Sequence, residues 1–276
     1  MSESLVPSAV RSAISAAISI ENLRHVYPDG HIGLDGVDLE IAEGERVAVL
    51  GPNGAGKTTL MLHLNGVLTA TSGTVRIGGV PVARNTLRDI RRRVGLVFQD
   101  PDDQLFMPTV AQDVAFGPAN FGLTGPELAA RVRHALELVS LTDHADRSPA
   151  HLSGGQRRRA ALATVLACDA EILVLDEPSA NLDPVARREL AETLAVLDVT
   201  MLIVTHDLPY AAQLCTRAVI IDGGRVVADG EIGAILADTD LLAAHRLELP
   251  WGFVVPQRSQ AGRDAVSRPG PAARSR

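Results

Sequence analysis

The sequence reads Gly51-Pro52-Asn53-Gly54-Ala55-Gly56-Lys57-Thr58 between the apolar run Arg46–Leu50 and a stretch without helix breakers at residues 57–66. The glycines let backbone N–H groups turn inward around a phosphate, where side chains would collide. A helix that begins at the loop adds the positive end of its dipole. The pattern G-x-x-x-x-G-K-[ST] therefore predicts a loop that binds nucleotide phosphates, with a buried strand before it and a helix after it.

Each part of this loop has an expected role in binding ATP and Mg²⁺. The backbone from Gly51 to Gly56 surrounds the phosphates, and Lys57 reaches the β- and γ-phosphate oxygens as a point charge. Thr58 offers its hydroxyl to Mg²⁺, and Thr59 completes the predicted nucleotide-binding set. Lys57 is the one lysine among the 26 lysines and arginines of the chain. We interpret the excess of arginine as codon preference. Because arginine occupies every other basic position, a lysine at position 57 indicates a function that requires lysine.

A second feature is the apolar run Ile172–Leu175, which ends in Asp176 and Glu177. Carboxylates at the C-terminal end of a parallel strand face the ligand crevice of an open α/β sheet. We expect Asp176 to hold Mg²⁺ through water, and Glu177 to orient and deprotonate the attacking water. Alone, a strand that ends in Asp-Glu-Pro fits a solvated turn equally well. The phosphate loop upstream favours the catalytic interpretation.

The composition limits the class of protein. The 276 residues are 46% hydrophobic, which suffices for one large α/β domain. The formal charge of −7 argues against a nucleic-acid partner, because phosphate neutralisation needs a basic face. Two cysteines without a CxxC pair favour a reducing compartment. We find no apolar run long enough to cross a membrane and no signal peptide, so we expect any membrane role to depend on a partner.

Strands and helices are expected to alternate along the chain, which favours a doubly wound α/β sheet. Residues 1–17 are expected to be flexible, and residues 257–276, rich in Arg, Ser, Pro, Gly and Ala, to be a disordered tail. Strands are predicted at residues 19–27, 46–50, 74–77, 172–175 and 202–204. Helices are predicted at residues 57–66, 126–141 and 155–167.

The stretch Leu152-Ser153-Gly154-Gly155-Gln156 matches the signature motif of ABC ATPases. Ser153, the glycine N–H groups and a helix N-terminus would form a second phosphate cradle. This cradle has no lysine, so it suits phosphates that are already held elsewhere. In the family, two cassettes pack head to tail and enclose two ATP molecules. The resemblance therefore implies a second ATPase subunit as partner, in a homodimer or a heterodimer.

Further elements that resemble the family occur in its order. Tyr27 resembles the aromatic residue that stacks on adenine, and Gln99 the Q-loop glutamine that senses Mg²⁺ and water. Asp183 ends a stretch similar to the D-loop, and His206 resembles the switch histidine that contacts the γ-phosphate. The match covers about residues 18–235. It implies a P-loop NTPase (RecA-like) core with an antiparallel β subdomain and a helical subdomain at about residues 100–165, followed by a C-terminal extension at residues 236–256.

A narrower resemblance lies between Gln99 and Leu123. The stretches 98–106, 108–110 and 113–118 are similar to the ATPases of energy-coupling-factor (ECF) transporters, the cobalt/nickel type CbiO above all. This implies an integral-membrane coupling subunit, a substrate-binding membrane subunit and a peripheral place on the cytoplasmic face of the cell membrane. In the family, the segment after the Q-loop receives the coupling helices. Its apolar residues fit either that contact or the core of the helical subdomain: Leu105, Phe106, Val110, Phe116 and Phe121.

Three alternatives stay open. An ECF ATPase could energise vitamin uptake, since the substrate is bound by other subunits. A soluble ABC protein that acts on ribosomes or DNA usually has two cassettes or a coiled-coil insertion, and neither is evident here. A regulatory cassette without catalysis is disfavoured by Glu177 and His206.

Overall fold

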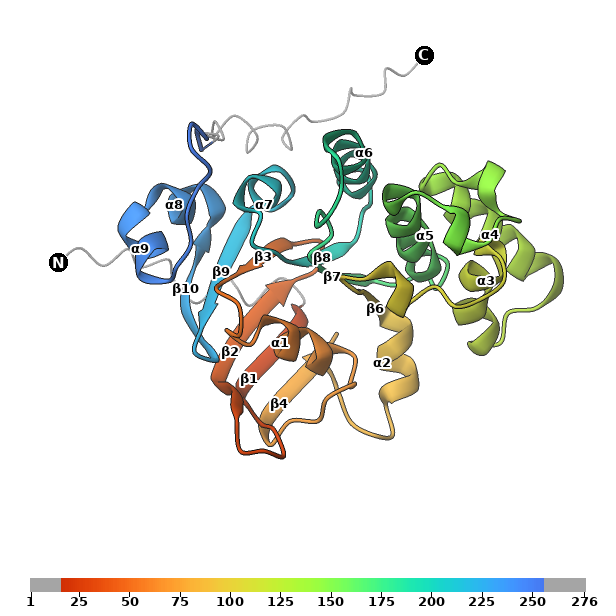
Figure 1. Cartoon of the computed structure of the whole chain (residues 1–276). Helices are drawn as coiled ribbons and strands as arrows, with labels where there is room; N and C mark the ends of the chain where they lie inside the picture. The colour runs from red at the N-terminus through yellow and green to blue at the C-terminus, as the bar shows by residue number, and fades with distance from the viewer. Residues whose placement is uncertain (1–15, 256–276) are drawn as a thin grey trace, which may run out of the picture.

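Two β-sheets form the framework of the protein (Figure 1). A computed structural model describes residues 16–255. One sheet has the order β10 (Arg225–Glu231), β9 (Arg217–Asp222), β3 (Arg46–Leu50), β8 (Thr200–Val204), β7 (Ile172–Asp176), β6 (Val94–Val97). The other has the order β2 (Ile32–Ala42), β1 (Ala16–Val26), β4 (Ser72–Ile77), β5 (Val80–Pro81). The predicted α/β class is confirmed.

The middle of the larger sheet is parallel and buried on both faces. β3 pairs in parallel with β8 and β9, and β7 pairs in parallel with β8 and β6, whereas β10 is antiparallel to β9. Along β3, Val47 and Val49 enter one apolar cluster, while Ala48 and Leu50 enter the other. Burial on both sides explains why these strands appear in the sequence as continuous apolar runs rather than as alternating ones.

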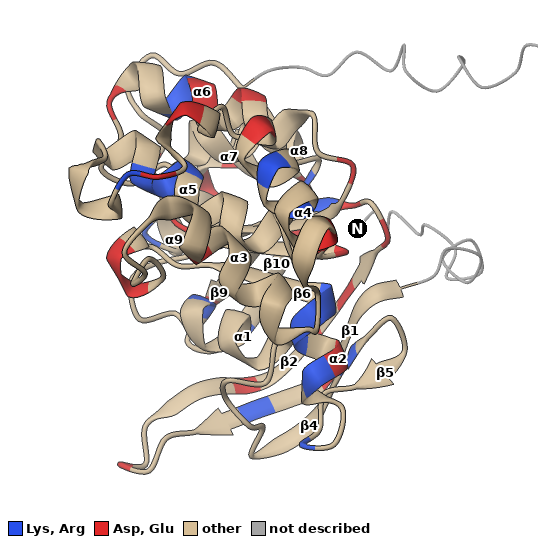
Figure 2. Ribbon diagram, turned by 90° about the vertical axis from the view of Figure 1, so that its right-hand side faces the viewer, with Lys and Arg blue, Asp and Glu red and all other residues tan. Residues whose placement is uncertain are grey.

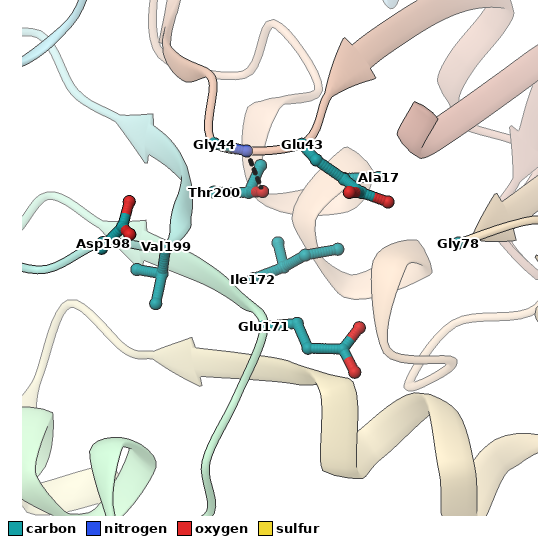
Figure 3. A pocket seen from close by; sticks show the side chains of 9 residues that line it. All are labelled: Ala17, Glu43, Gly44, Gly78, Glu171, Ile172, Asp198, Val199 and Thr200. Atoms are coloured by element: carbon teal, nitrogen blue, oxygen red, sulfur yellow. Dashed lines mark hydrogen bonds between the residues drawn. The ribbon is translucent and has the colours of Figure 1, made fainter. Parts of the chain in front are cut away.

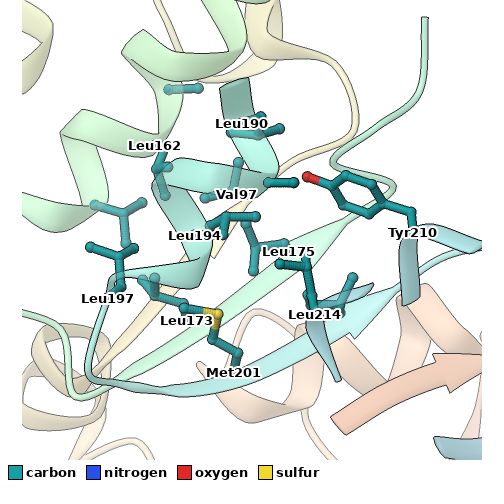
Figure 4. Packing of buried hydrophobic residues seen from close by; sticks show 14 of the residues in the cluster. Val97, Leu162, Leu173, Leu175, Leu190, Leu194, Leu197, Met201, Tyr210 and Leu214 are labelled. Carbon is teal, nitrogen blue, oxygen red and sulfur yellow. The ribbon is translucent and has the colours of Figure 1, made fainter. Parts of the chain in front are cut away.

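Helices cover one face of this sheet, and the antiparallel sheet covers the other together with α1 and α2. Leu162 of α5 and Leu190 and Leu194 of α6 pack against Leu173 and Leu175 of β7 (Figure 4). The helices are α1 (Lys57–Leu64), α2 (Leu87–Arg93), α3 (Val110–Asn120), α4 (Gly125–Leu138), α5 (Gly154–Leu166), α6 (Pro184–Ala195), α7 (Leu208–Leu214), α8 (Ile232–Ala237) and α9 (Thr239–Ala244). Short 3₁₀ turns lie at η2 (Pro101–Asp103), η3 (Thr142–His144) and η4 (Pro149–His151).

Several boundaries differ from the sequence-based expectation. The helix predicted to reach residue 141 ends at Leu138, because Ser140 adopts a left-handed φ of 56° that cannot continue a helix. β1 begins at Ala16, inside the segment that we expected to be flexible. Residues 1–15 and the tail predicted at residues 257–276 lie outside the described part of the chain.

The C-terminal part of the described chain packs against the larger sheet. Ile232 and Leu236 of α8, Leu242 of α9 and Leu247 all belong to the cluster that contains β7 and α6. Between residues 16 and 255, no helix is both long enough and apolar enough to span a bilayer.

Helix α5 packs tightly against the larger sheet at Gly95. A Cβ atom at this position of β6 would lie 1.9 Å from Cγ1 of Val165 in α5 and 3.2 Å from Cβ of Ala170. Real side chains do not approach so closely, so α5 can seat on the edge of the sheet only above a glycine. This contact fixes the start of the loop after β6 relative to α5.

We expect Gly95→Ala to destabilise the fold by about 1–3 kcal/mol, because overpacking forces the helix away from the strand. The midpoint temperature of thermal unfolding should fall by roughly 2–4 °C for each kcal/mol of stability lost. Val165→Ala in the same chain removes the atom that is struck, and should recover part of the loss. Equal unfolding temperatures for Gly95→Ala with and without Val165→Ala would contradict this packing.

Candidate active site

The phosphate loop connects β3 to α1, and its shape depends on glycine. Gly51 and Gly56 have φ values of 145° and 105°, a region that residues with a side chain avoid. A Cβ atom at Gly51 would lie 2.0 Å from the carbonyl oxygen of Ile221, and one at Gly56 would lie 2.4 Å from that of Gly33. The loop is thus pressed against neighbouring backbone, and Gly56 leads directly into α1 as its N-cap.

Lys57 is held at the centre of this loop. Its ammonium group donates to the carbonyl oxygens of Gly51 at 2.7 Å and Pro52 at 3.0 Å. The side chain is buried, and burial lowers the pKa of Lys57 below its usual value, while the nearby carboxylates of Glu177 and Asp176 oppose that shift. The positive charge is therefore costly in isolation, and a polyanion beside it would stabilise it.

A pocket of about 370 Å³ lies over the loop. Its lining combines most of the predicted nucleotide and metal residues with two that we did not predict, His31 and Gly33. The predicted residues in the lining are Tyr27, Asn53, Gly54, Ala55, Gly56, Lys57, Thr58, Thr59, Gln99, Asp176 and Glu177. Gly51 and Pro52 are not in the lining, and they contribute the carbonyl groups that hold Lys57.

Tyr27 forms one wall of the pocket. Its hydroxyl group lies 2.9 Å from Oγ1 of Thr59, and its ring faces that of His31 with centroids 6.0 Å apart and planes at 21°. Thr59 lies in the first turn of α1, so Tyr27 is tied to the helix that carries Lys57. An aromatic wall next to a phosphate cradle suits a nucleotide, because the base can stack on the ring.

The oxygen groups suited to Mg²⁺ lie at one end of the pocket. Oγ1 of Thr58 donates to Oδ2 of Asp176 at 3.3 Å, and Gln99 lines the same pocket. Burial raises the pKa of Asp176 above its usual range, and the hydrogen bond from Thr58 counteracts that rise. Hydroxyl, amide and carboxylate oxygens are hard ligands, so these residues fit Mg²⁺ with its nucleotide.

Glu177 is the most firmly oriented carboxylate of the site. Its Oε2 accepts from the hydroxyl of Thr205 at 2.9 Å, and its Oε1 accepts from the backbone N–H of His206 at 3.0 Å and from His206 Nδ1 at 2.8 Å. Glu177 also has a φ of 44°, which is unusual for a residue with a long side chain. Strain that is held by several bonds is common at functional positions. The carboxylate is thus fixed in direction beside Asp176.

The signature residues lie outside this pocket. Ser153 caps α5: its hydroxyl accepts from the N–H of Gln156 at 3.2 Å, and Gln156 Oε1 accepts from the N–H of Ser153 at 2.9 Å. Gly154 and Gly155 form the first turn, and Gly154 borders a separate hollow of about 630 Å³ that also reaches Thr58, Gln99 and Asp176. The structure does not bring Ser153, Gly155 or Gln156 to the phosphate pocket of the same chain.

Asp183 has a capping role in this structure. Its Oδ1 accepts from the N–H groups of Val185 at 2.9 Å and Ala186 at 3.0 Å, at the start of α6. It does not line the phosphate pocket.

Residues 34–180, which include the phosphate loop, the signature and the acidic strand end, match the family model for the ABC transporter. The chain belongs to the ABC transporter ATPase family. It is 47% identical over 240 residues to the energy-coupling factor transporter ATP-binding protein EcfA of Carboxydothermus hydrogenoformans, covering 86% of this chain and 88% of that protein. It is 63% identical over 238 residues to a Streptomyces coelicolor protein provisionally named an ABC transporter ATP-binding protein, covering 86% and 92% of the two chains.

Solved structures agree with the family. CbiO1 of Clostridium perfringens, described as part of the ABC transporter complex cbiONQ, superposes with a TM-score of 0.75 and 36% identity, over 86% of this chain and 96% of its own. The dimeric ATP-binding cassette MJ0796 bound to ADP and Pi superposes with a TM-score of 0.70 and 29% identity, over 78% and 98% of the two chains. The predicted ABC ATPase fold is confirmed.

Two residues that hold the site of this ABC ATPase were missed from the sequence. The hydroxyl of Thr205 donates to Glu177, and the one sequence signal for this role is the position of Thr205 directly before His206. Arg158, a buried side chain of α5, donates to the carbonyl oxygens of Phe98 at 2.9 Å and Ala180 at 3.3 Å. It thereby connects the loops on either side of the oxygen groups suited to Mg²⁺, and no local sequence pattern marks it.

The apolar residues after the Q-loop divide between core and surface. Leu105 and Val110 are buried in the cluster around α5, so they belong to the core of the ABC ATPase. Phe106 and Phe116 are 62% and 43% exposed, and their rings meet edge to face with centroids 4.9 Å apart. This exposed aromatic pair is therefore the part of the segment that is available to a partner.

A further hollow, of about 500 Å³, lies at the opposite ends of β7 and β8 (Figure 3). Glu43, Glu171 and Asp198 line it. Three carboxylates repel phosphate, so this hollow does not suit a nucleotide.

We expect Thr205→Val to lower kcat for ATP hydrolysis about tenfold, because Glu177 loses a donor worth roughly 1–2 kcal/mol. KM for ATP should stay within about twofold, since Thr205 does not line the pocket. Thr205→Ser keeps the hydroxyl group and is the matched control. Steady-state ATPase assays on the unchanged chain, Thr205→Val and Thr205→Ser measure kcat and KM. An unchanged kcat in Thr205→Val would show that the hydrogen bond does not orient Glu177.

Proposed function

We propose that this chain is the ATP-hydrolysing subunit of an ECF-type ABC importer, attached to the cytoplasmic face of the membrane. The observation that carries the proposal is Glu177, oriented by Thr205 and His206 beside the Thr58–Asp176 pair. The identity to EcfA of Carboxydothermus hydrogenoformans and the likeness to CbiO1 support the ECF type.

In this proposal, each residue has a task in hydrolysis. Lys57 and the N–H groups of the phosphate loop bind the β- and γ-phosphates, and Tyr27 stacks on the base. Thr58, Gln99 and Asp176 hold Mg²⁺, which neutralises charge that develops on the phosphate oxygens. Glu177 accepts a proton from the attacking water, and His206, hydrogen-bonded to Glu177, contacts the γ-phosphate.

A second ATPase subunit completes the site. Ser153, Gly154, Gly155 and Gln156 form a helix N-terminus suited to phosphate, but they do not lie in the pocket of their own chain. We propose that they cover the nucleotide of a neighbouring subunit, and that Asp183 lies at the same interface. The dimeric form of the cassette MJ0796 supports this arrangement.

The exposed aromatic pair is the proposed contact for the integral-membrane coupling subunit. Phe106 precedes α3 and Phe116 lies on it, and the only charged residue of α3, Asp113, is buried. Figure 2 shows α3 and α4 on the same side of the molecule as β6 and α2. Exposed apolar pairs of this kind mark interaction sites, and aromatic residues are frequent anchors in them. A substrate-binding membrane subunit would complete the importer.

For the cargo we propose cobalt or nickel ions. The support is the resemblance to the CbiO type between Gln99 and Leu123, together with the structural likeness to CbiO1. Vitamin uptake is the competing cargo, because the ATPase subunit does not itself bind the substrate.

Glu177→Gln should abolish turnover and retain ATP binding, because the amide keeps the shape of the side chain and loses the basic oxygen. The variant should form an ATP-dependent dimer, which size-exclusion chromatography with light scattering detects. Lys57→Ala serves as the control for loss of binding, since it should lower the affinity for the nucleotide itself. Wild-type hydrolysis by Glu177→Gln would refute the catalytic assignment.

The transport role predicts an integral-membrane protein as the companion of this chain. Purification of the tagged chain from detergent-solubilised membranes should retain that protein, and Phe106→Ser with Phe116→Ser should release it while ATP binding persists. Cells that lack the chain should lose uptake of labelled cobalt or nickel. Retention of ribosomes or DNA in place of a membrane protein would overturn the transport role, and loss of vitamin uptake alone would overturn the cargo.

A further inference from the structure

Gln156 is held from two sides at the start of α5. Its Oε1 accepts from the backbone N–H of Ser153 at 2.9 Å, and its Nε2 lies 3.1 Å from Nε2 of His144. The first bond determines which end of the amide is the oxygen, so the amide NH₂ faces His144. Nε2 of His144 therefore accepts a hydrogen bond, and the neutral ring carries its proton on Nδ1.

His144 belongs to η3, in the connection between α4 and α5, and the residues after it are tied to α3. The carbonyl oxygen of Ala145 accepts from the N–H of Ala111 at 2.8 Å, and that of Arg147 accepts from the N–H of Val110 at 3.0 Å. Val110 and Ala111 open α3, where N–H groups lack partners within the helix. The connection that carries His144 is thus fixed to the start of α3.

The start of α3 is in turn tied to the exposed aromatic pair. The buried carboxylate of Asp113 accepts from the N–H groups of Phe106 at 3.0 Å and Met107 at 2.9 Å. A series of short contacts therefore leads from Phe106 through α3 and Ala145 to His144 and the signature serine.

We propose that His144 is a positioning residue for the signature motif: by accepting from Gln156, it holds Ser153 and the N-terminus of α5 in the orientation that receives the nucleotide of a neighbouring subunit. The inference rests on the proposed function, because it requires a second ATPase subunit. His144 does not line the phosphate pocket of its own chain, so it acts on the site across the dimer. Its link to α3 connects that orientation to the surface proposed for the membrane subunit.

Three substitutions isolate the hydrogen bond. His144→Phe keeps a planar ring and removes the acceptor. His144→Gln places an amide oxygen at about the reach of Nε2, and should restore the bond. His134→Phe is the matched control, because His134 is exposed on α4 and its side chain has no hydrogen bond within residues 16–255.

Two measurements distinguish an effect on the nucleotide site between two subunits from an effect on the nucleotide pocket of a single chain. In the Glu177→Gln background, His144→Phe should raise the ATP concentration for half-maximal dimer formation about 2- to 10-fold, the loss expected for one hydrogen bond. KM for ATP hydrolysis should rise by a similar factor in the otherwise unchanged chain. Binding of a fluorescent ATP analogue to the monomer should stay within about twofold, and His144→Gln should recover both losses.

The proposal would be overturned if His144→Phe and His134→Phe had the same KM and required the same ATP concentration for dimer formation. An equal defect in His144→Gln would overturn it too, because the acceptor would then be irrelevant. If thermal unfolding shows that His144→Phe is destabilised, His144→Asn, whose shorter amide does not reach Gln156, takes its place. Continued hydrolysis by Glu177→Gln alone would instead remove the proposed function, so the two failures are distinguishable.

Discussion

The parallel register of β3, β8 and β7 is the constraint on which the active site depends. Val49 pairs with Val204, and Val204 pairs with Asp176, so the three strands end within one residue of one another. The residues that follow each strand therefore reach one edge of the sheet, where the phosphate loop, Thr205 and Glu177 meet. Burial of these strands on both faces holds their ends in place, and the Gly95–Val165 contact sets the position of the neighbouring loop after β6.

At this edge the backbone of Glu177 is as constrained as its side chain. Its N–H donates to the carbonyl oxygen of Val204 at 2.8 Å, while its φ of 44° turns the chain out of the strand. Three donors then fix the carboxylate. In the role that we propose for Glu177, a carboxylate that is oriented before the substrate arrives needs little reorganisation during the reaction. The conformational cost is met by the sheet beneath it.

The sequence was sufficient to predict most of the residues that line the pocket, and insufficient to predict the residues that hold them in place. Lys57, Thr58, Asp176 and Glu177 belong to local patterns whose spacing has a chemical reason, and the structure brings them together. Arg158 could not be predicted, because its bond to Phe98 joins residues 60 positions apart and depends on how α5 seats on the sheet. The role of His144 could not be predicted either, because its bond to Gln156 requires the turn at η3. The end of α4 was misjudged because Ser140 is not a typical helix terminator.

Lys57 also makes the nucleotide pocket chemically unique within this chain. The sequence contains no other lysine, so apart from the α-amino group at the N-terminus the protein has a single primary amine. Burial lowers the pKa of that amine, and the carbonyl oxygens of Gly51 and Pro52 hold its nitrogen in place. Lys57 is therefore the single side-chain target for an amine-directed label in this sequence, and it lies where the phosphates of ATP are expected to protect it.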